Sequence, residues 1–316
     1  MPQESGHSIT TNHYKGRSPY ESLFFYFWFW LYSKYFGEKI NSARIENGWN
    51  NASAKKKTTD DSSAIKLIDF ETPEIEHYLS QSTHLLVSIP PLTGAGDSVL
   101  LKYADLIKRH AFHIEWLGYF SSTSVYGDHQ GNWVDETSAC KPHSLSGILR
   151  LKTEQAWLSY AKANQLPLHI FRLAGIYGPE RNILERIHLG KQYSIFKEGQ
   201  VFSRIHVDDI VSVLLASIQA IHPLSIYNIA DDEPEASHVI DAYAAFLLQR
   251  SPLPLVPFEK ASLSAMELEF YSNNRRVSNL KIKNELNIAL QYPSFREGLT
   301  QLWKEKENKQ RREMRE

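Results

Sequence analysis

The chain has 316 residues, of which 42% are hydrophobic and 22% are charged, and its formal net charge is −1. This length and composition fit one large globular domain, or a domain with a smaller lobe, and allow a sizeable core. A charge so close to zero creates no overall field toward nucleic acid or anionic lipid, so neither is expected as a partner. The single cysteine, Cys140, cannot form an intrachain disulfide, which suits a reducing cytoplasm.

Residues 23–32 form an apolar and aromatic run, LFFYFWFWLY. The run is far shorter than the roughly 20 residues that span a bilayer, so no membrane span is expected. It also lacks the basic segment and cleavage site of a signal peptide. Its strand-forming residues favour a buried first strand. The alternative, an aromatic anchor on a membrane surface, lacks the basic face that such anchors carry.

Residues 1–20 are polar and aperiodic and are predicted to be disordered, and residues 47–63 are predicted to form a loop. Elsewhere, strand-forming segments alternate with segments of helical spacing. The predicted strands are 65–70, 85–89, 114–120, 168–173 and 226–229. The predicted helices are 73–80, 98–110, 143–164, 238–248, 280–286 and 295–303, and 205–218 is predicted as a strand end leading into a helix.

This alternation predicts an α/β protein with a parallel sheet and right-handed crossovers. Ligands bind at the carboxyl ends of the strands in such sheets. The alternation becomes less regular after Gly178. We therefore expect a sheet domain over residues 21–178, a smaller interleaved substrate lobe over 179–305 and a charged tail over 306–316.

Four motifs follow predicted strands: SSTSVYG at 121–127, RLAGIYGP at 172–179, RIHVDD at 204–209 and YNIADD at 227–232. A hydroxyl at a strand's carboxyl end can bind a substrate carbonyl or hydroxyl, although a serine-rich turn by itself needs no chemistry. In order and spacing, the four motifs closely resemble those of the extended short-chain dehydrogenase/reductase (SDR) group, which includes NAD-dependent epimerases and dehydratases.

The resemblance implies a Rossmann-type doubly wound parallel sheet with a smaller C-terminal substrate lobe. It further implies an NAD(P)-dependent oxidoreductase or epimerase that acts on a sugar nucleotide or a small hydroxy compound. NAD or NADP is the expected cofactor. A homodimer through the long helices is compatible with the resemblance, although no residue here demands one.

Several positions carry roles that the resemblance implies. Ser122 stands at the position of the catalytic Ser or Thr. Asp69 stands where an acidic side chain meets the adenine amino group, and a turn cap is the alternative for it. Four cofactor-lining positions are expected after two strands, namely Ile89, Pro90, Leu173 and Gly175. For Ile89 and Leu173, a plain core position is the alternative. His206 and Asp208 are expected to be structural, because an Asp caps a strand-to-helix junction well.

The family's Tyr-x-x-x-Lys pair is replaced. Counting back from Glu154, Ser146 takes the place of the Tyr, which is the family's general acid/base, and Arg150 takes the place of the Lys. Arg150 keeps the positive charge but not a tunable amine, and Ser146 has a shorter reach and a much less acidic hydroxyl. Lys152 is expected to point elsewhere on the helix. An active chain would therefore use Ser122 with Ser146 or a substrate group, while Arg150 holds the cofactor's ribose or phosphate.

The glycine-rich loop of the family is also replaced. Trp28, Trp30 and Ser33 lie where glycines would let backbone amides approach the pyrophosphate, and two indoles would block that approach. Because Trp is encoded only by TGG, codons compatible with residues 28–31 give Gly-Phe-Gly-Tyr when shifted by one base. The same shift at 49–52 can give Gly-Thr-Thr followed by Arg, which would suit the 2′-phosphate of NADP and slightly favours that cofactor.

We therefore hypothesise that residues 24–52 contain short out-of-frame windows, which the genomic codons would decide. Two kinds of function stay open. One is an atypical SDR enzyme. The other is a catalytically inactive Rossmann-fold binding or regulatory module, or a degenerate, frameshifted family member. The missing Tyr and Lys favour the second kind, whereas the intact C-terminal motifs count against simple decay.

Overall fold

The computed structural model describes the backbone of residues 24–27 and all of residues 70–71 and 73–314. Trp28, Trp30, Ser33 and Asp69 therefore lie outside the described residues. So do the predicted disorder of residues 1–20, the predicted loop at 47–63, and the predicted strand at 65–70 apart from Phe70, which is in a turn.

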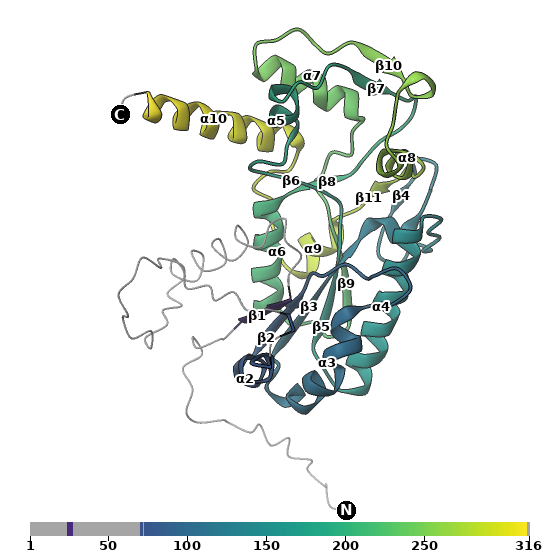
Figure 1. The fold of residues 1–316 in the computed structure, drawn as a ribbon, viewed down its shortest axis with the longest axis vertical. Helices are drawn as coiled ribbons and strands as arrows, with labels where there is room; N and C mark the ends of the chain where they lie inside the picture. Colours follow the sequence, from purple (N-terminus) through teal and green to yellow (C-terminus); the bar gives the residue numbers. More distant parts are fainter. Residues whose placement is uncertain (1–23, 28–69, 72, 315–316) are drawn as a thin grey trace, which may run out of the picture.

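Five parallel strands form the central sheet in the order β1-β2-β3-β5-β9 (Figure 1). Their bounds are Phe24–Phe27 (β1), His84–Val87 (β2), Trp116–Ser122 (β3), Leu168–Leu173 (β5) and Ser225–Ile229 (β9). Leu173 lies opposite both Ser122 and Ile229, so β3, β5 and β9 end at one edge of the sheet. The predicted parallel α/β architecture is confirmed.

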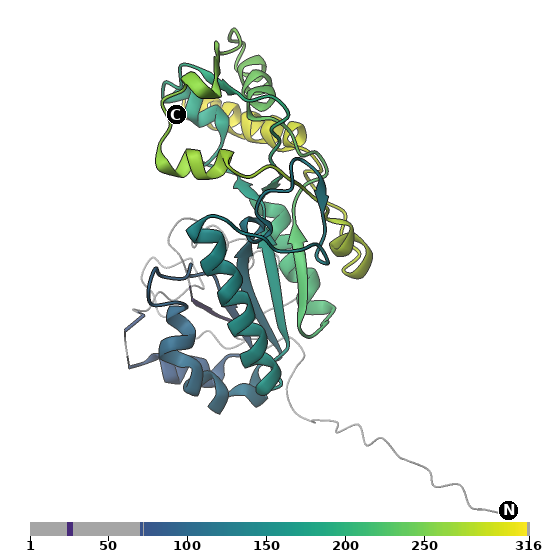
Figure 2. The same ribbon diagram turned by 90° about the vertical axis from the view of Figure 1, so that its right-hand side faces the viewer.

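Helices cover both faces of the sheet (Figure 2). One face packs against α2 (Ile75–Gln81), α3 (Ser98–Arg109) and α4 (Leu145–Ala163). The other face packs against α6 (Val207–Gln219) and α9 (Leu280–Glu285). Both faces of the central strands are apolar because both are covered by helices.

Side chains of strand β3 contribute to the apolar cores on both faces of the sheet. Leu117 and Tyr119 point into one core, and Trp116 and Phe120 point into the other, because side chains alternate along a strand. Gly118 lies under the indole of Trp116, where an added Cβ would be 2.3 Å from the ring. The glycine therefore makes room for the largest side chain of that core.

The smaller lobe follows β5 and has its own apolar cluster, which includes Tyr177, Leu184, Ile240 and Phe295. Its short strands pair as β6 (Gly175–Tyr177) with β8 (Arg204–His206) and β7 (Ser194–Phe196) with β10 (Leu255–Pro257), and β11 (Arg276–Val277) pairs with the earlier strand β4 (Trp133–Val134). Its helices are α5 (Ile183–His188), α7 (Ser237–Leu247), α8 (Ala265–Tyr271) and α10 (Phe295–Glu313). Three 3-10 turns complete the described chain at Ala111–His113, Thr123–Tyr126 (η2) and Phe258–Lys260.

The structure corrects some predicted boundaries. Strand β2 ends at Val87, so Ile89 and Pro90 follow it rather than close it. Helix α4 begins two residues later than predicted, because the Ser144 side chain accepts from the amide of Gly147 at 3.1 Å and caps the helix. Helix α10 runs to Glu313 and so includes most of the charged segment that was expected to be a tail.

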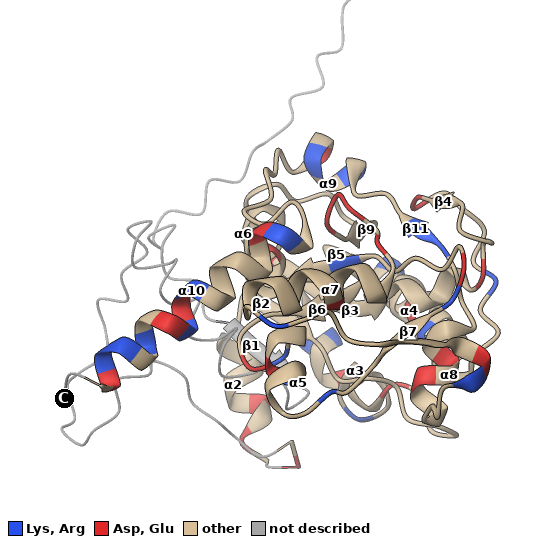
Figure 3. Ribbon diagram, turned by 90° about the horizontal axis from the view of Figure 1, so that it is seen from above, with Lys and Arg blue, Asp and Glu red and all other residues tan. Residues whose placement is uncertain are grey.

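Charged residues of both signs are spread over the described elements (Figure 3). No helix in residues 70–71 and 73–314 combines the length and the apolar character that crossing a bilayer would require. The same residues hold no group of three or more His, Cys, Asp or Glu side chains placed to bind a metal ion.

Candidate functional site

The turn after β3 carries the first predicted site residue. The Ser122 side chain caps η2 by accepting from the amide of Ser124 at 3.1 Å, and its position is half-buried. Gly127 ends the turn with φ +73°, and an added Cβ would lie 1.9 Å from the carbonyl oxygen of Lys141. Accepting one hydrogen bond leaves the O–H of Ser122 able to donate, so capping and substrate binding are compatible.

Helix α4 begins against this turn. A Cβ added to Gly147 would lie 2.8 Å from the carbonyl oxygen of Ser124, so only glycine allows this close approach. Ser146 and Arg150, the residues predicted to replace a Tyr and a Lys, lie on this helix, whose first turn is thereby held against the η2 turn. Lys152 is exposed, in agreement with its predicted direction.

Arg150 connects the helix to the sheet. Its Nη1 donates to the carbonyl oxygen of Phe120 at 2.6 Å and to the hydroxyl of Tyr119 at 3.3 Å. Burial raises the pKa of Tyr119 to about 12, and the nearby Arg150 charge opposes that rise. Tyr119 therefore stays protonated at neutral pH. The positive charge predicted for this place is present, with part of its donor capacity used on the protein itself.

Ser146 makes a contact that the sequence did not indicate. Its hydroxyl donates to Oε1 of Glu269 on α8, and its oxygen lies 3.3 Å from that of Ser144. This bond joins the smaller lobe to the first turn of α4. Glu269 is thus a carboxylate beside the family's Tyr position, contributed by a helix about 120 residues further along the chain.

A buried polar network supports the same edge of the sheet. Arg172 on β5 donates from Nε and Nη2 to the carboxylate of Glu154, and from Nη1 to the hydroxyl of Tyr126 at 3.0 Å. Tyr126 in turn donates to Oδ1 of Asn228 at 2.7 Å. The network joins the SSTSVYG, RLAGIYGP and YNIADD motifs by hydrogen bonds. Tyr126, Arg172 and Asn228 therefore stabilise this edge of the sheet.

The predicted cofactor-lining residues lie at the ends of two strands. Ile89 and Pro90 are half-buried just after β2, and Ile89 packs against the core that contains Trp157. Leu173 is buried at the end of β5, and half-buried Gly175 begins β6. All four therefore follow or end strands of the central sheet.

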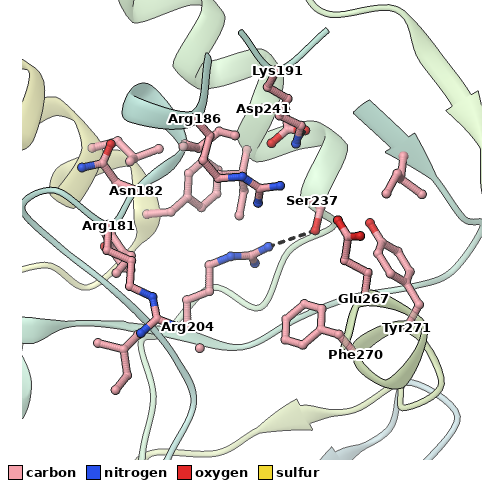
Figure 4. A pocket seen from close by; sticks show the side chains of 18 residues that line it. Arg181, Asn182, Arg186, Lys191, Arg204, Ser237, Asp241, Glu267, Phe270 and Tyr271 are labelled. Carbon is pink, nitrogen blue, oxygen red and sulfur yellow. Dashed lines mark hydrogen bonds and ion pairs between the residues drawn. The ribbon is translucent and has the colours of Figure 1, made fainter. Parts of the chain in front are cut away.

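A cavity of about 360 Å³ opens in the smaller lobe beside β6 (Figure 4). Four cationic side chains line it, namely Arg181, Arg186, Lys191 and Arg204, together with the carboxylates of Asp241 and Glu267. Four positive and two negative groups leave a formal excess of +2. Such an excess favours an anionic ligand.

Arg204 lies across the floor of this cavity. Its Nη1 donates to the carbonyl oxygens of Phe202 at 2.8 Å and Glu235 at 2.9 Å, and its Nη2 donates to Ser237 Oγ at 3.3 Å (Figure 4). No carboxylate forms an ion pair with Arg204 among residues 70–71 and 73–314. Lys191 is paired with Asp241 at 2.5 Å, and burial lowers the pKa of Lys191.

A smaller hollow of about 90 Å³ adjoins the cavity. The two share Gly175 and Phe270 in their walls. The hollow is further lined by Thr123 and Ser124 of the η2 turn, by Glu269 and by Arg275. Glu269 and Arg275 could not be predicted from the sequence, because neither belongs to a motif and both lie far from η2 in the chain.

The fold and the site define a Rossmann-type α/β protein with a cationic cavity in a C-terminal lobe. The sequence model of the NAD dependent epimerase/dehydratase family matches residues 96–230. Protein YeeZ of Escherichia coli K12 is 30% identical over 218 residues, which are 68% of this chain and 73% of YeeZ. The chain belongs to this family, and its predicted resemblance to extended SDR proteins is confirmed.

Two solved structures show the same architecture. A functionally unknown conserved protein from Silicibacter pomeroyi is 47% identical, with a TM-score of 0.68 over 72% of this chain and 79% of that one. UDP-glucuronic acid 4-epimerase from Bacillus cereus, in complex with UDP-glucuronic acid and NAD, is 18% identical, with a TM-score of 0.59 over 75% of this chain and 79% of that one. At that identity the likeness shows the fold.

Proposed function

We propose that this protein is an NAD(P)-dependent oxidoreductase or epimerase that binds a sugar nucleotide. The observation that carries the proposal is the cationic cavity, which meets the hollow beside Ser124 at Gly175 and Phe270. The phosphates would lie among Arg181, Arg186 and Arg204, and the sugar would extend toward Ser122. A small hydroxy compound would leave most of the 360 Å³ cavity unfilled.

The proposed cofactor is a nicotinamide dinucleotide. Ile89 and Pro90 would line it after β2, Leu173 and Gly175 would lie near the nicotinamide, and Arg150 would hold the ribose or a phosphate. Such a cofactor accepts a hydride from the substrate or returns one to it. An epimerase of the same fold was solved in complex with UDP-glucuronic acid and NAD, which supports a cofactor of this class.

The protein's own groups would orient the substrate and move a proton. The Ser122 hydroxyl would hydrogen-bond the reacting hydroxyl or carbonyl. Ser146 is a weak acid by itself, but its bond to Glu269 provides a carboxylate that can accept a proton. Glu269 would therefore replace the family's Tyr as the group that accepts a proton.

Two titrations test the proposal. Fluorescence titration with NADH and NADPH should show saturable binding, and calorimetry should show binding of UDP-glucose. Arg186→Ala should weaken UDP-glucose binding about tenfold or more, because it removes a charged partner of the phosphates. Arg109→Ala, an exposed arginine on α3, is the matched control and should leave it unchanged. Absence of binding of both UDP-glucose and UDP-glucuronic acid, with and without either cofactor, would contradict the proposal.

A non-enzymatic binding module is the second candidate. It is favoured by one observation: Arg150 and Ser146, which would serve catalysis, both already bond to protein groups. In that case the nucleotide titrations should show no binding. If changing Trp28 and Trp30 to glycine restored NADH binding, the chain would be a family member whose cofactor site had been blocked.

A further inference from the structure

Arg275, between α8 and β11, is a half-buried cation with few acceptors. Its Nη1 donates to the carbonyl oxygen of Gly127 at 2.9 Å, and its Nη2 lies 3.5 Å from Thr123 Oγ1. Its Nε is buried and has no hydrogen-bond acceptor among the described residues. A guanidinium carries five N–H donors, so most of its capacity is unused.

No carboxylate neutralises Arg275 by an ion pair within residues 70–71 and 73–314. Asp128 contributes attraction, but its Oδ1 accepts from the amides of Gln130 at 3.1 Å and Asn274 at 2.9 Å. Burial lowers the pKa of Arg275 to about 10, which reflects the cost of a charge held away from water. Such a group is stabilised when an anion binds beside it.

The hollow next to Arg275 suits a small anionic group. Its volume of about 90 Å³ corresponds to about three water molecules. Thr123 and Ser124 add hydroxyl groups to its wall, and Ser124 is two residues from Ser122. Glu269 also lines it, which disfavours a dianion such as a phosphate monoester more than a singly charged group.

We propose that this hollow binds a carboxylate carried by the sugar of the substrate, with Arg275 as its partner. The natural substrate is then an acidic sugar nucleotide, with its phosphates in the larger cavity and its carboxylate beside the η2 turn. A planar carboxylate matches the fork of an arginine. This inference rests on the proposed function for the nucleotide part, and Arg275 is its specificity-determining residue.

Calorimetry with UDP-glucuronic acid and UDP-glucose tests the inference, since the two differ by a carboxylate in place of a hydroxymethyl group. We expect UDP-glucuronic acid to bind about tenfold tighter or more. Arg275→Gln should reduce its affinity to that of UDP-glucose. Arg276→Gln is the matched control, because Arg276 donates to the carbonyl oxygen of Gly131 instead, and it should keep the preference. Thermal melting of both variants checks folding, and Arg275→Lys should lose part of the preference if Arg275→Gln does not fold.

The outcomes separate this inference from the proposed function. Equal affinity for the two compounds would overturn the inference and leave the function standing. Binding of neither would contradict the function, and NMR of the arginine Nε–H groups then decides the inference. The Nε–H signal that disappears in Arg275→Lys should shift saturably with acetate and not with chloride, and no shift with acetate would overturn the inference.

Discussion

Arg172 on β5 and Glu154 on α4 form an ion pair in which Nη2 and Oε2 are 2.7 Å apart and the side chains are 4% and 2% exposed. The pair fixes the long helix to the carboxyl end of the central sheet, where the site lies. A buried pair need not add much stability relative to an apolar pair, but removing one partner leaves the other charge buried alone.

Glu154→Gln should therefore lower the free energy of unfolding by about 3–5 kcal/mol. Urea denaturation followed by circular dichroism measures the change. Lys152→Gln, an exposed substitution on the same helix, should stay within about 0.5 kcal/mol of the wild type. A Glu154→Gln midpoint equal to that of the control would show that the pair does not hold the helix.

Tyr126→Phe should lower the free energy of unfolding by about 1–3 kcal/mol, because it leaves Oδ1 of Asn228 and an N–H of Arg172 buried without their partner. The effect should not add to that of Glu154→Gln, since the groups share one network. A double-mutant cycle in urea measures this coupling. Tyr193→Phe, whose hydroxyl makes a 3.3 Å bond to the Ser262 carbonyl, is the control with a small effect.

Gly147→Ala should lower the free energy of unfolding by about 1–3 kcal/mol, because the new methyl group would meet the Ser124 carbonyl oxygen and the Pro142 ring. Alanine otherwise favours a helix over glycine, so a destabilising effect would isolate the steric contact. Ser159→Ala, at an exposed position of α4, is the comparison. A stabilised Gly147→Ala variant would mean that α4 and the η2 turn can separate at little cost.

Asp209 should make stability fall as pH rises from about 4 to about 6. Burial raises its pKa to about 6, although it accepts from the amides of Gln291 and Tyr292. The folded state therefore binds a proton that the unfolded state releases near pH 4, so Asp209 contributes stability below pH 4 that is lost by pH 6. The difference between the pKa values of Asp209 in the folded and unfolded states corresponds to about 2–3 kcal/mol in the free energy of unfolding.

Urea midpoints measured between pH 4 and pH 7 for the wild type and Asp209→Asn test this dependence. The variant cannot ionise at residue 209, so the fall between pH 4 and pH 6 should be smaller in it by that amount. Asp105→Asn, at an exposed position of α3, should keep the wild-type profile. Parallel profiles of wild type and Asp209→Asn would contradict the assignment to Asp209.

Much of the central fold could be predicted from local pattern. The strand at 168–173 was predicted with the bounds that β5 has, and α3, α6 and α7 lie within two residues of their predicted bounds. These segments are strongly periodic or continuously apolar, and burial between two helical layers requires that pattern. The short strands β7 and β10 and helix α8 of the lobe were not predicted, because segments of three to seven residues carry little periodicity.

The site was predictable only where it follows motifs. The family resemblance singled out Ser122, Ser146 and Arg150; in the structure Ser122 ends β3, and Ser146 and Arg150 lie on α4, which packs against the η2 turn. Glu269 and Arg275 could not be placed, because they reach that turn from α8 and the segment after it. Their partners Ser146 and Thr123 lie 123 and 152 residues away in the chain.

The sequence by itself determined the fold class and the family, because these depend on residue types at short, fixed spacings. Only the tertiary structure decided how the remaining groups are used. It showed that Arg150 bonds to the β3 backbone, that Ser146 donates to a carboxylate, and that Arg275 is half-buried and forms no ion pair with any residue that the structure describes. Such contacts depend on how the lobe packs onto the sheet, and no local pattern encodes that packing.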